Sequence, residues 1–284
     1  MSYYFSTYIF GRKLFYMGEN LQLNADRFVG FADVYDHGRP KCPENVKKII
    51  LKYLGYNPSL VVDMGCGTGL STIIWSNVSD KVIGIDPSID MIEEAKKKAS
   101  ALDNLIFISS FSDDTGLKDH CADVITCSQS FHWMNPETTL NEVYRILKMR
   151  GIFAVYDYDW PPVCNWEAEI EYQKLFKKVR EMESTHGDIK DSFVRWDKNN
   201  HLSNIEKLGR FRYTREIVFS NCESCNAQRF IEMALSHGGL QASIRADRDE
   251  IIPYLTAFKK KIMDIYGDNE FEICFCYRMH IGIK

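Results

Sequence analysis

Residues 60–69, Leu-Val-Val-Asp-Met-Gly-Cys-Gly-Thr-Gly, constrain the fold more than any other stretch of the chain. The first three residues form a short apolar run, which is typical of a buried parallel strand. The alternating glycines predict a tight turn that lets the backbone approach a ligand closely. Residues 70–75 are then expected to begin a helix whose first N–H groups are unpaired. Strand, turn and helix together predict a nucleotide-type binding site.

The spacing of this stretch separates it from the better-known glycine loops. Gly65, Gly67 and Gly69 follow an acid, Asp63, whereas the dinucleotide fingerprint G-x-G-x-x-G and the P-loop lysine are absent. An acid ahead of the glycines suits a ligand with a cationic amino group. The pattern resembles motif I of the class I S-adenosylmethionine (SAM) methyltransferases. An NAD-binding oxidoreductase shares the strand–turn–helix arrangement but requires the other glycine spacing.

Apolar periodicity predicts alternating strands and helices on both sides of this motif. We expect strands at 81–86, 104–109, 122–128 and 151–157, and helices at 43–54, 88–101 and 136–148. Further along, a helix is expected at 167–183, a strand at 210–220, helices at 227–237 and 250–266, and a strand at 271–283. The resemblance implies an α/β fold, with a Rossmann-like, mostly parallel seven-stranded sheet, helices on both faces and an antiparallel last strand.

The break at Trp160-Pro161-Pro162 predicts an exit from the sheet. We therefore expect residues 25–159 to form the SAM-binding core and residues 160–210 to form a helical cap inserted over the active-site edge. Residues 211–284 are expected to complete the core, and residues 1–24 to form an N-terminal arm or lid.

The resemblance assigns a set of residues to the cofactor. Asp86 ends the second strand, where an acid can accept hydrogen bonds from both ribose hydroxyls; alternatively, it is an ordinary acid at a helix N-terminus. In relatives of the trans-aconitate methyltransferase type, the tyrosine and arginine of Tyr35-x-x-x-Arg39-Pro40 approach the SAM carboxylate; the alternative is that Tyr35 packs and Arg39 is a solvated charge. The cofactor-binding residues expected on these grounds are Tyr35, Arg39, Asp63, Gly65, Cys66, Gly67, Asp86, Pro87, Ser112, Asp113 and Gln129.

The acceptor side of the site is expected at the end of the fourth strand. There Gln129-x-x-His132-Trp133 resembles trans-aconitate-type and other type 11 methyltransferases. His132 is the candidate catalytic residue, as a general base, although it can also line the SAM pocket or pack as an ordinary buried histidine. Trp133 and Trp160 are expected to line the substrate pocket with it.

Composition limits the remaining possibilities. The chain of 284 residues carries a net charge of −4 and has a pI near 6.0, which argues against a dedicated nucleic-acid binder. No signal peptide or membrane span is predicted. Nine cysteines without regular spacing predict a reduced, cytoplasmic chain without a metal site.

The sequence therefore predicts a SAM-dependent methyltransferase that acts on a small molecule, with a carboxylate or a hydroxyl as the candidate acceptor group and S-adenosylhomocysteine as product. No nucleic-acid or membrane partner is expected, and the oligomeric state is left open. The alternatives are an RNA or protein methyltransferase and a non-catalytic SAM-binding protein.

Overall fold

The computed structural model describes residues 22–24, 38–191, 193–246 and 249–284. Its sheet has seven strands in the order β3-β2-β1-β4-β5-β7-β6. Neighbours pair in parallel except that β7 runs antiparallel to both β5 and β6. This confirms the predicted Rossmann-like fold. The strands are β1 (Leu60–Met64), β2 (Lys81–Asp86), β3 (Leu105–Ser109), β4 (Ala122–Ser128), β5 (Leu147–Tyr158), β6 (Tyr213–Cys225) and β7 (Phe271–Ile283).

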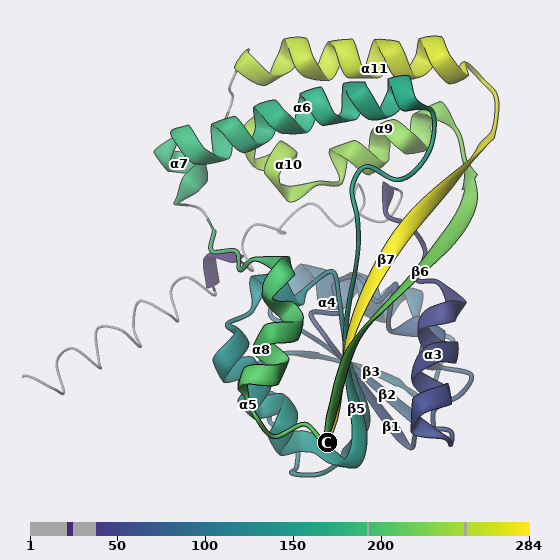
Figure 1. Ribbon diagram of the computed structural model, residues 1–284, viewed down its shortest axis with the longest axis vertical. Helices are drawn as coiled ribbons and strands as arrows, with labels where there is room; N and C mark the ends of the chain where they lie inside the picture. Colours follow the sequence, from purple (N-terminus) through teal and green to yellow (C-terminus); the bar gives the residue numbers. More distant parts are fainter. Residues whose placement is uncertain (1–21, 25–37, 192, 247–248) are drawn as a thin grey trace, which may run out of the picture.

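Helices cover both faces of the parallel part of the sheet (Figure 1). Successive side chains of a strand point to opposite faces, so the apolar run of β1 has to be buried on both. Val61 packs in a cluster with Val46 of α3, whereas Val62 packs in a second cluster with Val143 of α5. The helical segments around this sheet are α3 (Glu44–Leu54), η1 (Ile73–Trp75), α4 (Ile89–Lys98), η2 (Phe131–Trp133), α5 (Pro136–Ile146), η3 (Lys198–Asn200) and α8 (His201–Lys207).

A second layer of helices stands above the carboxyl-terminal edge of the sheet (Figure 1). The long ribbon of β6 and β7 reaches up into it, and Phe275 of β7 shares a core with Phe230 and Phe258 of the upper helices. The upper helices are α6 (Trp166–Thr185), α7 (Gly187–Lys190), α9 (Ala227–Leu235), α10 (Gly238–Arg245), η4 (Asp249–Ile251) and α11 (Ile252–Tyr266). Within the described chain, no helix is both long and apolar enough to span a membrane.

This layer is built differently from the expected cap at 160–210. Helix α6 packs against α10 and α11, so the segment 227–266, expected in the core, belongs to the upper layer. Helix α8, expected in the cap, instead packs against β6, β7 and α5 beside the sheet. Hydrophobic periodicity indicates that a helix buries one face, but it does not say against which partner.

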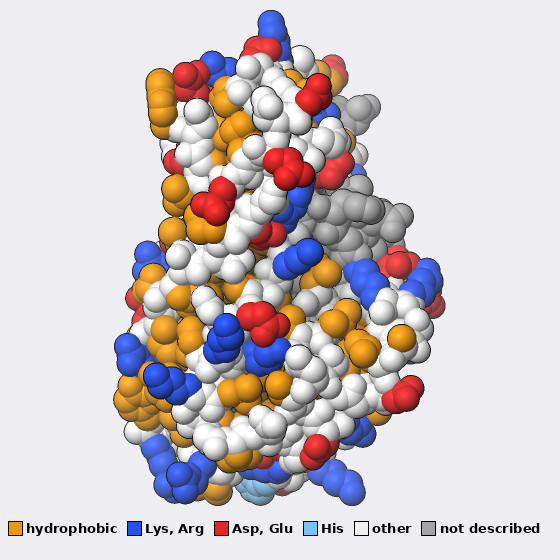
Figure 2. Space-filling view, turned by 90° about the vertical axis from the view of Figure 1, so that its right-hand side faces the viewer, with side chains coloured by type: hydrophobic (Ala, Val, Ile, Leu, Met, Phe, Trp, Pro, Cys, Tyr) orange, Lys and Arg blue, Asp and Glu red, His pale blue; other side chains and the backbone are white. Residues whose placement is uncertain are grey.

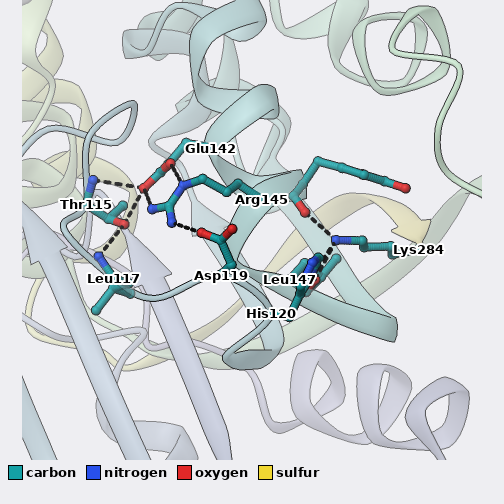
Figure 3. Close-up of polar contacts among 9 residues, drawn as sticks. Thr115, Leu117, Asp119, His120, Glu142, Arg145, Leu147 and Lys284 are labelled. Carbon is teal, nitrogen blue, oxygen red and sulfur yellow. Dashed lines mark hydrogen bonds and ion pairs between the residues drawn. The ribbon is translucent and has the colours of Figure 1, made fainter.

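Polar contacts fix the end of α5, where the chain turns into β5 (Figure 3). Arg145 donates to Glu142 at 2.7 Å and forms an ion pair with Asp119. The buried ammonium of Lys284 donates to the carbonyl of Leu147 at 2.8 Å. A cation at the carboxyl end of a helix is favourable because it meets unpaired carbonyls and the negative end of the helix dipole.

The expectation that all cysteines are reduced is wrong for one pair. Cys222 and Cys274 are bonded to each other, and they lie directly opposite in the register of β6 and β7. The sequence separates them by 52 residues. Only the pairing of the two strands brings them together, so spacing along the chain does not reveal the bond.

Candidate active site

A cavity of about 790 Å³ lies at the carboxyl ends of the parallel strands, between the sheet and the upper helices. Ligands bind at this edge in doubly wound sheets because the strand order reverses there. The lining combines the glycine turn, the ends of β2 and β4, the η3 segment and the inner side of α6. Its volume is in the range of sites for drug-sized ligands.

The glycine turn forms the floor of the cavity. Gly65 and Gly67 both line it and have positive φ angles, 66° and 52°. A Cβ on Gly65 would lie 2.5 Å from the Cβ of Ser130, whereas one on Gly67 would meet nothing within 4 Å. Gly65 is therefore fixed by close packing, and Gly67 leaves open space into which a ligand can fit. Cys66 is buried between them and borders a smaller hollow beside the main cavity.

The helix expected at 70–75 is wrong. The structure has only the one-turn 3₁₀ segment η1, and the N–H groups of the turn are already used. Those of Gly65 and Cys66 donate to the carbonyl of Ile85 at 2.7 and 3.0 Å. The N–H of Gly67 donates to Asp86 at 3.0 Å. These bonds attach the turn to β2, so the site does not present a row of free helical amides.

Asp63 lies beneath the turn and outside the cavity lining. It is fully buried, and its carboxylate accepts hydrogen bonds of 2.7 Å from the hydroxyls of Ser71, Thr72 and Thr126. Burial raises the pKa of Asp63, against the lowering effect of the three hydroxyls. In this arrangement Asp63 fastens the residues after the turn to β4, rather than contacting a ligand directly.

Asp86, by contrast, lies in the cavity wall at the end of β2, next to Pro87. One carboxylate oxygen accepts from Gly67 N–H and the other from Ser88 N–H, at 3.0 and 2.9 Å. Burial raises the pKa of Asp86 to about 6, although the two amides lower it. The carboxylate keeps unused lone pairs toward the cavity, because each oxygen has room for more than one donor. It can therefore serve a ligand hydroxyl and the turn at once.

The remaining expected cofactor residues fall into three groups. Ser112 and Gln129 line the cavity; the hydroxyl of Ser112 shares a hydrogen bond with Thr139. Asp113 is partly exposed and is not part of the lining. Tyr35 lies outside the described residues.

Arg39 lines the cavity on the side of the upper layer. Its guanidinium donates to the hydroxyl of Tyr158 at 3.1 Å and to the carbonyl of Ser236 at 2.9 Å. It also lies 5.9 Å from the centre of the Trp160 ring, within range of a cation–π contact. Arg39 therefore joins the sheet to the upper helices and places positive charge beside the cavity.

An aromatic wall closes the cavity toward α6. Here Trp160, which was expected, stacks on Tyr172 with a centroid distance of 5.8 Å, and Tyr172 stacks on Phe176 at 4.4 Å. The ring of His237 lies 4.2 Å from that of Trp160 and shares a 2.7 Å hydrogen bond with Tyr172. Sequence analysis missed Tyr172, Phe176 and His237. The i,i+4 spacing of the first two along α6 was the available signal.

His132 and Trp133 both line the cavity, as expected, from η2. Behind His132 lies a buried group of side chains around Asp157, the penultimate residue of β5. The carboxylate of Asp157 lies 2.7 Å from Lys198 Nζ, 3.3 Å from His201 Nε2 and 3.7 Å from His132 Nδ1. Lys198 also donates to Gln129 at 2.9 Å. Spacing along the chain does not reveal this group, because its members come from three separate segments, 129–132, the end of β5 and 198–201.

Burial and charge fix the ionisation of this group. Burial alone would raise the pKa of Asp157, but Lys198 and the two histidines outweigh it and hold that pKa far below its usual range. Burial, followed by the charge of Lys198, lowers the pKa of His132 well below its ordinary value. At neutral pH Asp157 is therefore ionised and His132 is neutral.

Comparison with known proteins indicates the kind of domain that carries this cavity. Residues 62–155 match the family model of a methyltransferase domain. The chain is 33% identical over 172 residues to a probable S-adenosylmethionine-dependent methyltransferase of Saccharomyces cerevisiae, a match that covers 55% of this chain and 59% of that relative. It is 23% identical over 244 residues to an uncharacterized methyltransferase-like protein of Schizosaccharomyces pombe, which covers 85% of this chain and 89% of that relative.

Among solved structures, the YcgJ protein of Bacillus subtilis has the same fold, with a TM-score of 0.54, 18% identity and coverage of 85% of this chain and 98% of that one. The match to the yeast relative spans less than two thirds of that protein's length. The matched segment, 62–155, contains the glycine turn, Asp86 and His132. The domain match, the relatives and the fold thus support a class I methyltransferase, with SAM as the cofactor of the domain matched at residues 62–155.

Proposed function

We propose that the whole chain transfers the methyl group of SAM to a small molecule bound in the cavity beneath the upper helices. The single observation that carries this proposal is the cavity itself. One cavity of about 790 Å³ is lined both by the cofactor-type turn and by the aromatic wall. A cofactor and an acceptor can therefore lie next to each other in it, as methyl transfer requires.

On the cofactor side, we assign the ribose to Asp86 and the floor to Gly65 and Gly67. The residues present fit such a group: Asp86 retains acceptor capacity toward the cavity, and the space above Gly67 is free. Ser112 lies at the same edge. When bound, SAM supplies an electrophilic methyl group on a sulfonium centre. The task of the chain is to hold the acceptor atom in line with that methyl group.

On the acceptor side, we propose a small anionic molecule with an apolar portion. Trp160, Tyr172 and Phe176 provide flat apolar surface, and Arg180 brings positive charge to the same lining, while Arg39 keeps its expected role toward the SAM carboxylate. A guanidinium recognises a carboxylate well because it donates two parallel hydrogen bonds. A carboxylate is thus the favoured acceptor group and a hydroxyl the second candidate. The trans-aconitate-like subtype is part of this proposal.

The proton-transfer role expected of His132 stays a prediction. Its low pKa makes the ring a neutral hydrogen-bond acceptor at pH 7, but also a weak base. An ionised carboxylate needs no base, whereas a hydroxyl acceptor would. Replacing His132 by Gln therefore discriminates between the two acceptor groups, since only transfer to a hydroxyl should depend strongly on this ring.

The proposal is tested by incubating the full chain with SAM and a mixture of small carboxylic acids and alcohols. Release of S-adenosylhomocysteine that depends on an added acid supports it. Arg180→Gln should then raise KM for the acid, while Lys177→Gln, on the same helix but outside the cavity lining, should not. SAM binding without any acceptor-dependent release would instead favour a non-catalytic SAM-binding protein. A cytoplasmic location and the lack of nucleic-acid and membrane partners likewise stay predictions.

A further inference from the structure

The group behind His132 contains more unsatisfied polar atoms than a buried cluster normally tolerates. His132, Asp157 and His201 are 6%, 8% and 1% exposed. Within the described part of the chain, His132 Nδ1 and both ring nitrogens of His201 have no hydrogen-bond partner, and the carboxylate of Asp157 has the 2.7 Å ion pair with Lys198 but no hydrogen bond. Leaving one such group unsatisfied costs about 1–3 kcal/mol. Several in one place call for an occupant that satisfies them together.

We propose that His132, Asp157 and His201 bind a divalent transition-metal ion, with Zn²⁺ as the best match to their chemistry. Two imidazoles and one carboxylate are a ligand set that Zn²⁺ accepts, usually with a fourth position left open. Mg²⁺ and Ca²⁺ prefer oxygen ligands throughout and are poor candidates. This proposal does not depend on the proposed methyl transfer, although the site shares His132 with the cavity.

The geometry is close to what an ion requires. The ligand atoms of the three residues all lie within 4.8 Å of one another. Ligands bound at about 2.1 Å in a tetrahedral site lie about 3.4 Å apart. Asp157 Oδ2 lies 3.3 Å from His201 Nε2, and Asp157 Oδ1 lies 3.7 Å from His132 Nδ1, which is close to that spacing. Binding therefore requires only a small adjustment of the three side chains.

Lys198 is the competitor for this position. Its ammonium forms the 2.7 Å ion pair with Asp157, and its side chain is 37% exposed. Such a side chain can rotate toward solvent when a metal ion takes its place. The competition gives the site a signature that an ordinary ion-pair cluster lacks, because removing the lysine charge should tighten metal binding.

The consequence of binding concerns the segment from Arg195 to His201. Trp196 donates its backbone N–H to the carbonyl of His132 at 2.9 Å, and Lys198 lines the cavity. An ion held by His132, Asp157 and His201 would fix this segment to the end of β5. It would also occupy Nδ1 of His132, so that Nε2 keeps its proton. Metal binding and a general-base role for His132 therefore exclude each other.

The test titrates the chelator-treated full chain with Zn²⁺ in a calorimeter, with Mg²⁺ as the comparison. We expect one Zn²⁺ per chain. Binding should be at least about tenfold weaker in His201→Gln, since even changes around the direct ligands of a metal cost that much. It should be tighter in Lys198→Met. Thiols of Cys222 and Cys274, which lie within 4.8 Å of Glu272, are a second possible site if reduced. The double variant Cys222→Ser, Cys274→Ser should therefore bind Zn²⁺ like the parent.

Circular dichroism confirms that each variant is folded, and Asp157→Asn replaces His201→Gln if the latter is not. Co²⁺ in place of Zn²⁺ should give visible absorption bands of a tetrahedral nitrogen–oxygen site without thiolate charge-transfer bands. No Zn²⁺ binding in either the parent or Lys198→Met would overturn the proposal. Binding that survives unchanged in His201→Gln and Asp157→Asn, or that disappears with the two cysteines, would overturn it as well.

Discussion

Asp86→Asn should weaken SAM binding without unfolding the chain. The carboxylate of Asp86 already accepts two backbone N–H groups, from Gly67 and Ser88, and a carboxylate has about four acceptor positions. About two remain for the ribose hydroxyls. Asparagine keeps the shape but removes the charge and replaces one acceptor oxygen by a donor.

The expected loss follows from these contacts. A hydrogen bond to a charged group contributes about 1.5–3 kcal/mol, and a neutral one about 0.5–1.5 kcal/mol. Losing one charge-assisted bond and weakening the other amounts to roughly 3 kcal/mol, which is about a 150-fold rise in Kd. Isothermal titration calorimetry with SAM and S-adenosylhomocysteine at pH 7.5 measures it directly.

The matched control is Asp123→Asn. Asp123 is an equally structural, buried carboxylate at the start of β4, where it accepts from the N–H groups of Ser59 and Leu60 and pairs with Lys148. Asp123→Asn should lower the free energy of unfolding about as much as Asp86→Asn does, measured by denaturant titration. It should leave the Kd for SAM unchanged. A folded Asp86→Asn protein with a Kd within twofold of the parent would refute the ribose assignment.

Three further predictions follow from buried charges. With the pKa of Asp86 at about 6, the fraction of protein with an ionised Asp86 falls about elevenfold from pH 7.5 to pH 5. The Kd for SAM, measured by calorimetry, should therefore rise about tenfold over that range in the parent and stay constant in Asp86→Asn. Lys284→Met removes a buried ammonium that contacts His120 and the carbonyls of Tyr144 and Leu147, and should lower the free energy of unfolding in urea by about 1–3 kcal/mol. Lys97→Met, at an exposed ion pair, should change it by less than about 0.5 kcal/mol; equal effects would contradict the structural role of Lys284. Asp63→Ala leaves three buried hydroxyls without their acceptor and should lower the free energy of unfolding by roughly 3 kcal/mol in the same assay, whereas Asp103→Ala, at an exposed residue, should change it little. A stable Asp63→Ala protein with lost SAM affinity would instead support direct contact between Asp63 and the ligand.

The parallel part of the fold could be predicted because its signals are local. The bounds expected for the parallel strands β2 and β4 agree with the structure to the residue. Apolar runs bounded by polar or turn residues produce such agreement, since burial on both faces leaves little freedom in where a strand starts and stops. The position of Asp86 in the cavity wall was predictable for the same reason, because it ends a strand at the edge where ligands bind, and its role toward the ribose stays a prediction.

What the sequence missed depends on contacts between distant segments. The glycine turn predicts close backbone approach but not the use of its amides by Ile85 and Asp86, which replaces the expected helix with a 3₁₀ turn. The Cys222–Cys274 bond likewise arises from strand register. Amphipathic helices such as α9 show a buried face, yet only the tertiary structure assigns that face to the upper layer rather than to the sheet.

The acceptor side was the least predictable part of the site. Side chains from the end of β5, from α6 and from the turn before α10 converge on one cavity, and no spacing rule connects them. The face of the molecule in Figure 2 shows Lys and Arg side chains interspersed with Asp and Glu. Overall charge therefore says little about the acceptor, and the cavity lining says more.

The central claim, that the cavity joins SAM to a small-molecule acceptor, is tested most directly by following a labelled methyl group. The full chain is incubated with SAM that carries an isotopically labelled methyl and with a mixture of small metabolites, protein and RNA, and the products are separated by size and analysed by mass spectrometry. We expect label on a small organic acid in the low-mass fraction, and its loss in Asp86→Asn at subsaturating SAM. Label confined to the protein or RNA fraction, or no transfer despite SAM binding, would contradict it.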